Sequence, residues 1–324
     1  MDKQITAHDV ARLAGVSQST VSRVFTEGAS VSDGSRKKVL KAAEELGYQP
    51  NEFARSLIMR KTRLIGLVMK NVDNPFYPAV LKKFTATLRS MGYGVLLIDT
   101  AEDELCPRDI EQLIAYKVAG VVIMDATASF GTAEALKKNG IPAVLFNRVV
   151  EETALLSVSC DNRSASREIA LHLIEDGCES FVYIAGKRGT STNLEREQSF
   201  TETLQAEGYR SDFTVGGYTY DGGFKAVKNL PSENMPDAIF AANDIMAMGA
   251  LDALKEMRLQ KPVRLIGFDD IPMASWPGYA LSTYKQPVDR MIEKTLGLLL
   301  GEGEERGTPA GPVYLEGELI IRET

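Results

Sequence analysis

The first residues with the chemistry for molecular recognition lie close to the start of the chain. Residues 6–25 read TAHDVARLAGVSQSTVSRVF. The outward side chains of the second expected helix in this stretch are Gln18, Ser19, Ser22 and Arg23. Short polar groups and one guanidinium near the start of an exposed helix suit contacts to base edges and phosphates of double-stranded DNA. A helical hairpin with a merely solvated polar face is the alternative.

Two short helices joined by a tight turn must position these side chains. Thr6 can cap the first helix, and Asp9 three residues later completes a capping box. Gly15 lies where the first helix must stop, and Ser17 can cap the second. The apolar residues expected to pack the two helices together are Val10, Leu13, Ala14, Val21 and Val24.

A third helix is expected over residues 33–46, with Ser32 as its cap and Gly47 as its stop. Its expected buried stripe consists of Val39, Leu40, Ala43 and Leu46. Pro50 then breaks the chain, and residues 51–62 could form a short helix or linker. This segment has too little apolar surface to be stable alone, so we expect it to fold only when it packs against another copy and DNA.

The sequence pattern changes at residue 63, where short apolar runs begin to alternate with amphipathic segments. These runs occupy residues 64–69, 95–99, 120–124, 143–146, 155–158, 181–185, 238–242 and 264–268. Such alternation predicts parallel strands in β-α-β units, and eight or more runs favour two doubly wound sheets over one. Ligands of such sheets bind beyond the carboxyl ends of the strands.

The loops at these strand ends carry side chains suited to a small polyhydroxylated ligand. Arg196 offers a planar set of donors, and Asp269 can accept two hydroxyl hydrogens. Asn74 and Asn243 can both donate and accept. The aromatic side chains that could lie against the C–H face of a sugar ring are Phe76, Tyr77, Trp276 and Tyr218.

Each of these side chains also has a purely structural alternative. Phe76 and Tyr77 could pack only against their own helix, and Asp269 could cap the following turn. Asn243 could cap the helix that follows it, and such capping is compatible with ligand contact. Arg196 could form a surface salt bridge.

Composition indicates a soluble, two-part chain. The 324 residues are 44% hydrophobic and 25% charged, with a net charge of −7. Residues 1–63 hold eleven Lys and Arg against seven Asp and Glu, a net +4, whereas the remainder holds 26 against 37, a net −11. A basic start and an acidic remainder are consistent with DNA contact by the first part alone. No apolar run of about 18 residues and no signal-peptide pattern occurs, so we expect a cytoplasmic protein.

Enzymatic and metal-binding motifs are not found in the sequence. The two histidines, His8 and His172, fall in expected helices away from any catalytic set. The glycine-rich stretch AGKRGTST lacks the residue order of a phosphate-binding loop. Three cysteines without metal-like spacing indicate reduced, partly buried thiols. We therefore expect no catalytic residues, no metal site and no cofactor.

The segments DVARLAGVSQSTVSRVF and LGYQPNEFARSL together resemble the LacI/GalR (lactose-repressor) family of bacterial transcriptional regulators. The resemblance continues through NPFY at 74–77, AANDIMAMGAL at 241–251, IGFDD at 266–270 and the tail LIIRET. It implies an all-α helix-turn-helix head followed by a core similar to periplasmic sugar-binding proteins, with two doubly wound parallel-sheet subdomains. It also implies an effector-controlled repressor that binds operator DNA as a homodimer.

The resemblance also assigns roles to individual residues. The candidate DNA-binding residues are Thr6, Ser17, Gln18, Ser19, Thr20, Ser22, Arg23, Asn51, Arg55 and Leu57. Among them, Leu57 matches the leucine that the family's hinge helices insert into the minor groove; a linker residue is the alternative. The candidate effector-binding residues are Asn74, Phe76, Tyr77, Asn147, Arg196, Tyr218, Asn243, Asp269, Trp276 and Gln286. Asn147 and Gln286 are the weaker candidates.

The expected division of the chain follows from the same resemblance. We expect a DNA-binding domain at 1–50, a hinge at 51–62 and an effector-binding, dimerising core at 63–324. Within the core, the N-subdomain is expected at 63–160 plus 287–318 and the C-subdomain at 161–286 plus 319–324. The effector is expected to be a sugar or sugar derivative; whether it induces or corepresses is open. A cytoplasmic sugar receptor without a DNA role and a sugar-active enzyme are the alternative functions.

The sequence departs from the family pattern at several positions. Thr26 and Glu27 replace the usual asparagine after the second helix, and Glu27 would repel phosphate. Ser199 replaces a customary glycine before Phe200, and its larger side chain could prevent close helix packing at this position. The sequence shows no leucine heptad after the last strand, so a dimer is expected and a tail-made tetramer is not.

Overall fold

The computed structural model describes residues 5–25, 29–48, 62–70, 74–100, 104–124, 126, 128–150, 155–257, 259, 261–301 and 311–324. The chain divides into two compact units, Met1–Thr62 and Arg63–Thr324. We call them the head and the core, and we describe each by itself.

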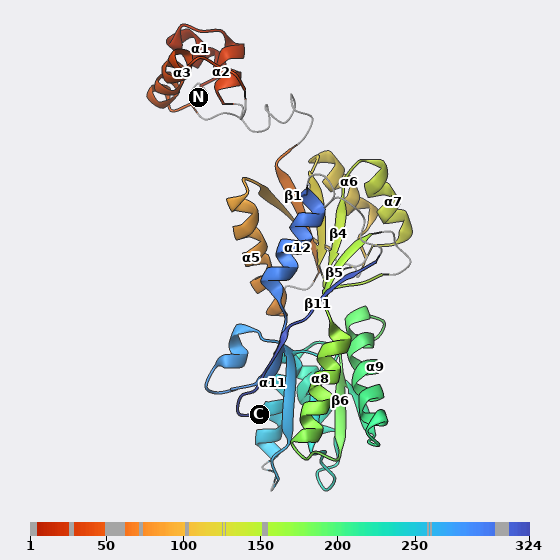
Figure 1. The fold of residues 1–324 in the computed structure, drawn as a ribbon. Helices are drawn as coiled ribbons and strands as arrows, with labels where there is room; N and C mark the ends of the chain where they lie inside the picture. The colour runs from red at the N-terminus through yellow and green to blue at the C-terminus, as the bar shows by residue number, and fades with distance from the viewer. Residues whose placement is uncertain are drawn as a thin grey trace. The chain divides into compact units, whose positions relative to one another are not determined.

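The described residues of the head form three helices, α1 (Ala7–Ala14), α2 (Gln18–Val24) and α3 (Asp33–Leu46) (Figure 1). Local side chains set their limits, as expected. Thr6 and Asp9 form a capping box at the start of α1, and Ser17 and Ser32 cap α2 and α3. Gly15 and Gly47 end α1 and α3 with φ of 64° and 63°, a conformation that glycine adopts without strain.

The core of the head differs from the expected one at two positions. Leu13 and Leu40, which the apolar spacing assigned to the interior, are each 47% exposed. The buried residues are small ones instead: Val10, Ala11, Ala14, Val21, Val24, Val39, Ala42 and Ala43. The three short helices contact one another through alanine and valine, which allow a close approach and leave the two leucines outside.

The first half of the core, which we call the N-half, is built on a six-stranded sheet of order β11-β5-β4-β3-β1-β2. Its strands are β1 (Leu64–Met69), β2 (Gly94–Asp99), β3 (Gly120–Met124), β4 (Ala143–Phe146), β5 (Leu156–Cys160) and β11 (Val313–Leu315). Its helices are α5 (Phe76–Ser90), α6 (Pro107–Ala115), α7 (Phe130–Lys138) and α12 (Val288–Leu300). Alternate β1 residues face opposite layers: Leu67 packs with α5 and α12, and Val68 with α6 and α7.

The second half, the C-half, has a sheet of order β12-β10-β9-β8-β6-β7. Its strands are β6 (Phe181–Ala185), β7 (Ser211–Val215), β8 (Ala238–Ala241), β9 (Arg264–Asp269), β10 (Ser282–Lys285) and β12 (Glu318–Ile320). Its helices are α8 (Asn162–Glu175), α9 (Ser191–Ala206), α10 (Tyr220–Lys228), α11 (Asp244–Met257) and the short 3-10 helix η1 (Pro272–Ser275). Within each sheet the described pairs are parallel, except β10 with β12.

Within the described residues the chain passes between the halves three times, after β5, after β10 and after β11. The predicted fold class, a helix-turn-helix head plus a core of two doubly wound parallel-sheet subdomains, is confirmed. The strands that the apolar runs did not predict are β7, β10, β11 and β12. β7 and β10 each contain only one or two large apolar residues, and β11 and β12 are only three residues long, so no long apolar run marks these strands.

Ser199, the departure from glycine, does not prevent close packing of α9 on α8. Its side chain is buried, and Oγ donates a 2.7 Å hydrogen bond to the carbonyl oxygen of Arg163 in α8. Cys160 and Cys178 are buried and free, as expected, and burial raises the pKa of the Cys160 thiol to about 12. Among the described helices, none has the length and apolar character needed to cross a bilayer.

Replacing Gly249 with alanine should lower the free energy of unfolding by about 1–3 kcal/mol, because the added methyl group overpacks a tight helix crossing. A Cβ at Gly249 in α11 would overlap the carbonyl oxygen of Tyr220 and lie 2.9 Å from the amide nitrogen of Phe224, both in α10. Urea unfolding followed by far-ultraviolet circular dichroism measures the change.

Gly297 supplies the matched control, since it is also a helix-interior glycine. A Cβ there would meet no heavy atom of the described residues within 4 Å. Gly297→Ala should therefore raise stability by up to about 1 kcal/mol through helix propensity. Equal behaviour of the two alanine variants would contradict the close α10–α11 packing.

Candidate effector site and DNA-binding surface

Strained backbone marks the carboxyl ends of the core strands. Positive φ angles occur at Asn147 after β4 (59°), at Tyr218 after β7 (63°), and at Asp269 and Asp270 at the end of β9 (123° and 54°). Residues other than glycine rarely adopt such angles, and they persist where surrounding contacts hold them. Three of the four are residues that the sequence analysis assigned to ligand binding.

Arg196 lies inside the C-half with its guanidinium held on three sides. Nε donates to Asn162 Oδ1 at 2.8 Å, Nη1 donates to the carbonyl oxygen of Ala242 at 2.6 Å, and the group lies 3.4 Å from the centroid of the Phe268 ring. Only 2% of the residue is exposed, so the alternative of a surface salt bridge is wrong. The third guanidinium nitrogen, Nη2, makes no hydrogen bond to any described residue.

Asn243 caps α11, and this capping leaves its amide nitrogen for another partner. Oδ1 accepts a 3.1 Å hydrogen bond from the Met246 amide. Nδ2 is buried and has no hydrogen-bond partner among the described residues. A buried, unsatisfied donor is costly in a folded protein, so the position is suited to a ligand acceptor.

Asn147 and Gln286 show the same property from the other strand ends. Asn147 Oδ1 and Gln286 Oε1 are buried acceptors without a partner among the described residues, and the two residues are 4% and 2% exposed. Gln286 Nε2 donates a 2.6 Å hydrogen bond to Asp269 Oδ1. One buried donor and two buried acceptors are therefore available where hydroxyl groups could both donate and accept.

Tyr218 lies against the end of β6. Its ring occupies the space that a side chain at Gly186 would fill, because a Cβ there would overlap the ring. Its hydroxyl is 3.3 Å from Thr192 Oγ1 at the start of α9. The positive φ at Tyr218 and the glycine beneath it together place this aromatic ring at the strand ends of the C-half.

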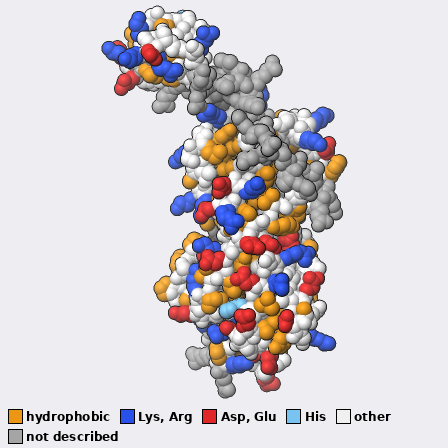
Figure 2. All heavy atoms as spheres, in the orientation of Figure 1, with side chains coloured by type: hydrophobic (Ala, Val, Ile, Leu, Met, Phe, Trp, Pro, Cys, Tyr) orange, Lys and Arg blue, Asp and Glu red, His pale blue; other side chains and the backbone are white. Residues whose placement is uncertain are grey.

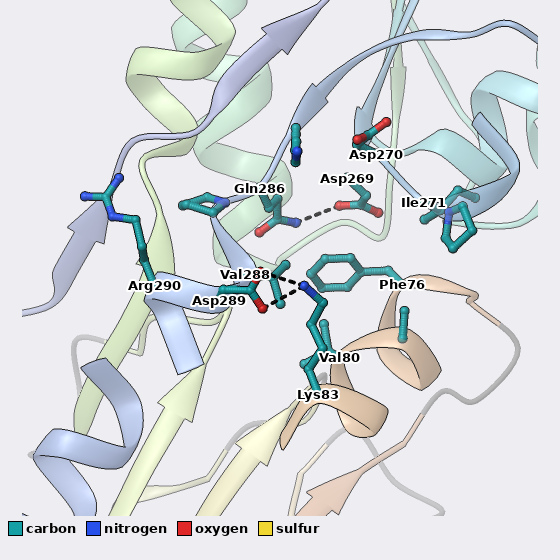
Figure 3. A pocket seen from close by; sticks show the side chains of 14 residues that line it. Phe76, Val80, Lys83, Asp269, Asp270, Ile271, Gln286, Val288, Asp289 and Arg290 are labelled. Atoms are coloured by element: carbon teal, nitrogen blue, oxygen red, sulfur yellow. Dashed lines mark hydrogen bonds and ion pairs between the residues drawn. The ribbon is translucent and has the colours of Figure 1, made fainter. Parts of the chain in front are cut away.

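A groove of about 380 Å³ opens between the two halves. Figure 3 shows Asp269 and Gln286 on one side of it and Phe76 of α5 on the other. Val80 and Val288 add apolar surface, and the ion pair between Lys83 Nζ and Asp289 Oδ1, 2.7 Å long, lies at one end. Sites of this size with apolar walls and few polar groups are typical of small-molecule binding.

Of the candidate effector residues, Phe76, Asp269 and Gln286 line this groove. The candidates that do not line it are Asn74, Tyr77, Asn147, Arg196, Tyr218, Asn243 and Trp276. Trp276 is 55% exposed beyond η1 and does not line the groove. Asn74 accepts a hydrogen bond from the Phe76 amide, and Tyr77 is buried in the core of the N-half. Asn74 and Tyr77 thus act at least as structural residues of the α5 start.

Sequence reasoning missed three buried polar residues at the strand ends. Arg148 Nη1 donates to Thr192 Oγ1 at 2.8 Å and so joins the N-half to α9 of the C-half. Asn162 orients Arg196, and Asp244 is fully buried at the start of α11. Arg148, Asn162 and Asp244 each directly follow or flank a candidate residue or strand, which is the signal that could have found them.

Electrostatics at the β9 end is dominated by carboxyl groups. Burial raises the pKa of Asp244 well above its usual range, and the neighbouring Asp269 raises it further. Asp270 forms a 2.7 Å ion pair with Arg322. The described residues contain no cluster of His, Cys, Asp and Glu that could hold a metal ion.

The head presents the polar surface that the sequence predicted. Gln18, Ser19, Ser22 and Arg23 are all exposed on α2, whereas Val21 and Val24 are buried. Figure 2 shows Lys and Arg side chains spread over the visible face of the head. The candidates Asn51, Arg55 and Leu57, with the expected hinge helix, lie outside the described residues, as do Thr26 and Glu27.

Comparison with known proteins agrees with this two-part organisation. The family model for bacterial regulatory proteins of the lacI family matches residues 6–51, and a periplasmic binding protein domain matches residues 65–275. The ribose operon repressor of Halalkalibacterium halodurans is 31% identical and is aligned over 98% of this chain and 96% of its own length. The HTH-type transcriptional regulator CelR of Thermobifida fusca is also 31% identical, over 98% of both chains.

Solved structures give the same result. The Lac repressor dimer bound to operator and the anti-inducer ONPF is 26% identical with a TM-score of 0.86, covering 99% of this chain and 98% of its own. A complex of CelR with cellobiose is 30% identical with a TM-score of 0.69, covering 98% and 99%. Head and core together thus define a regulator with a DNA-binding domain and a ligand-binding domain. The chain belongs to the LacI family of bacterial regulatory proteins.

Proposed function

We propose that this protein is a sequence-specific transcriptional repressor whose affinity for operator DNA is controlled by a small effector, a sugar or sugar derivative. The DNA-binding role is supported by the lacI-family head and by repressors among the relatives. The effector role is supported by the periplasmic-binding-protein core and by the cellobiose complex of CelR.

The observation that carries the effector assignment is the amide of Asn243. Its oxygen is committed to capping α11, and its buried nitrogen has no partner among the described residues. Arg196, which donates to the carbonyl oxygen of the preceding residue Ala242, and the hydrogen-bonded pair of Gln286 and Asp269 supply further donors and acceptors. A polyhydroxylated molecule can satisfy donors and acceptors in one site because each hydroxyl both donates and accepts.

We assign base reading to Gln18, Ser19 and Arg23, supported by their exposure on the second helix of the head. The other assigned DNA contacts are Thr6, Ser17, Thr20, Ser22, Asn51, Arg55 and Leu57. Two heads of a homodimer would occupy successive half-sites of a near-palindromic operator.

Effector control follows if the ligand changes how the two halves meet. Two hydrogen bonds join the N-half to the start of α9, one from Arg148 to Thr192 and one from the Val149 amide to Ser191 Oγ at 3.0 Å. A ligand that favours one arrangement of the halves shifts the protein only by its difference in affinity for the two arrangements. We propose that the shift alters the spacing of the two hinges and so the register of the heads.

The remaining assignments extend the same proposal. We place the N-subdomain at 63–160 plus 287–318 and the C-subdomain at 161–286 plus 319–324, supported by the membership of the strands in the two sheets. We propose a cytoplasmic protein that associates with the nucleoid when bound to DNA. We assign no catalytic role to the cleft, in line with the repressors among its relatives.

Selection from a random oligonucleotide pool at low salt tests the DNA half of this proposal. The full-length protein should enrich one near-palindromic site, with an affinity that falls steeply as salt rises. The selected duplex is then titrated in the presence of sugars, sugar phosphates and nucleosides, and one class should change the dissociation constant by roughly 5- to 150-fold. A protein that enriches no sequence, or whose operator affinity no metabolite changes, would contradict the proposal.

A further inference from the structure

We propose that Asp244 is a neutral, protonated carboxyl that positions Asp269 by holding the turn between β9 and η1. Asp244 is the first residue of α11 and is fully buried. Its importance for the effector rests on the proposed function of the cleft, whereas its protonation and its hold on the turn do not.

Hydrogen bonds connect Asp244 to the turn after β9 and to strand β10. Oδ2 accepts a 2.8 Å hydrogen bond from the amide of Ile271, and Oδ1 accepts a 2.5 Å hydrogen bond from Thr283 Oγ1 of β10. Gly267 of β9 leaves room for this carboxyl, because a Cβ there would overlap Oδ1. Asp244 therefore contacts β9, β10 and the segment between them.

The turn that Asp244 holds is the strained one. Asp269 and Asp270 have φ of 123° and 54°, and Ile271, the next residue, donates to Asp244. Backbone in this region is retained only when neighbouring contacts over-determine it. On the other side of the turn, Arg322 donates to Asp270 at 2.7 Å and to the Leu281 carbonyl oxygen at 2.6 Å.

The charges around Asp244 explain why it is neutral. The ionisable groups that act on its charge are Asp269 and Asp270 of the turn, and Asp270 is paired with Arg322. Arg196 donates to the Ala242 carbonyl oxygen two residues earlier and to Asn162. Asp244 forms no ion pair with any described residue, and a buried carboxylate beside a second carboxylate is unfavourable. Burial, followed by the charge of Asp269, raises the pKa of Asp244, and these effects outweigh the hydrogen bonds from Thr283 and Ile271, which lower it.

A neutral Asp244 removes the repulsion that a second buried carboxylate would exert on Asp269. Only one of two neighbouring buried carboxyl groups readily ionises. Asp269 lines the groove, where its carboxylate can accept hydroxyl hydrogens of an effector. Asp244 is not among the residues that line the groove, so it acts on the ligand only through Asp269 and the turn.

Infrared spectroscopy of the full-length protein without ligand tests the protonation directly. At pH 7 we expect the C=O stretching band of a protonated carboxyl in the wild type and its loss in Asp244→Asn. Asp237→Asn is the control: Lys261 and two backbone amides hold the pKa of Asp237 at about 2, so this substitution should leave the band unchanged. A wild type without the band, or an Asp244→Asn variant that keeps it, would overturn the proposal.

The pH dependence of unfolding provides a second, independent measurement. The unfolded chain releases the Asp244 proton near the ordinary pKa of 3.8, whereas the folded protein keeps it to higher pH. Between the unfolded and folded pKa values of Asp244, each pH unit raises the unfolding equilibrium constant of the wild type by up to about tenfold. Asp244→Asn removes this pH dependence. The stability of the variant relative to wild type should therefore rise as the pH increases above the ordinary pKa of 3.8. A pH-independent difference would overturn the proposal.

Amide hydrogen exchange at Ile271 separates positioning from protonation. Asparagine can still accept from Ile271 and donate to Thr283, so Asp244→Asn should retain the protection of this amide. Asp244→Ala cannot, and its Ile271 amide should exchange at least tenfold faster. Equal protection in both variants would show that Asp244 does not hold the turn. Failure of a ligand screen, by contrast, would affect the proposed function and leave these ligand-free results intact.

Discussion

Replacing Arg196 with lysine should lower effector affinity by roughly 10- to 150-fold, while operator binding without effector is retained. Lysine keeps the positive charge but not the planar set of donors that reaches Asn162, Ala242 and a ligand at once. A hydrogen bond to a charged group contributes about 1.5–3 kcal/mol, which corresponds to this range. Isothermal titration with the ligand found by screening measures the effect.

Arg163 provides the matched control for this substitution. It also lies on a helix of the C-half, but it donates to Gln198 Oε1 at 3.0 Å on the exposed surface. Arg163→Lys should leave effector affinity within about twofold of wild type. Denaturant unfolding of both variants confirms that they are folded under the assay conditions. If Arg196→Lys binds the ligand as tightly as wild type, Arg196 is not an effector contact and its role is confined to packing on Phe268.

Replacing Arg23 with glutamine should lower affinity for the selected operator by roughly 30-fold to 10⁴-fold in a dimer. A bidentate arginine–guanine contact discriminates by about 1–3 kcal/mol, and two half-sites double this difference. Arg23 is exposed in the last turn of α2, next to the buried Val24 that anchors the helix. Fluorescence anisotropy with operator and random duplexes at one salt concentration measures both affinities.

Lys41→Gln removes the same charge from the same head and is the control. Lys41 is exposed on α3, whose side chains the sequence does not assign to base reading. Its loss should weaken operator and random duplexes alike, by no more than about tenfold, because only general phosphate attraction is reduced. Equal losses on the two duplexes for Arg23→Gln would assign Arg23 to phosphate contact and contradict base reading.

The head illustrates how far local rules extend. The limits of α1 and α3 followed from Thr6, Asp9, Gly15, Ser32 and Gly47, because capping bonds join residues three or four apart and depend little on the rest of the fold. The packing of the same helices was harder. Apolar spacing assigned Leu13 and Leu40 to the interior, but the short helices approach through alanines and expose both leucines.

In the candidate effector site, distant contacts decide more than local sequence rules do. Residue types at strand ends predicted that Arg196, Asn243 and Asp269 are polar groups of one region, and the family resemblance added Gln286 as a weaker candidate. Sequence did not reveal which atoms of these residues remain available, because that depends on partners far away in the chain. Gln286 and Asp269 are 17 residues apart, and Arg196 and Asn162 are 34 apart.

The sequence alone determined the two-part organisation, the capped helices of the head and the strand-helix alternation of the core. These features are encoded locally, by caps, glycines and the period of apolar residues. Only the tertiary structure decided that Arg196 is buried, that Trp276 is exposed and that burial and the charge of Asp269 raise the pKa of Asp244. Burial and the pairing of charges are properties of distant segments brought together, so no local pattern specifies them.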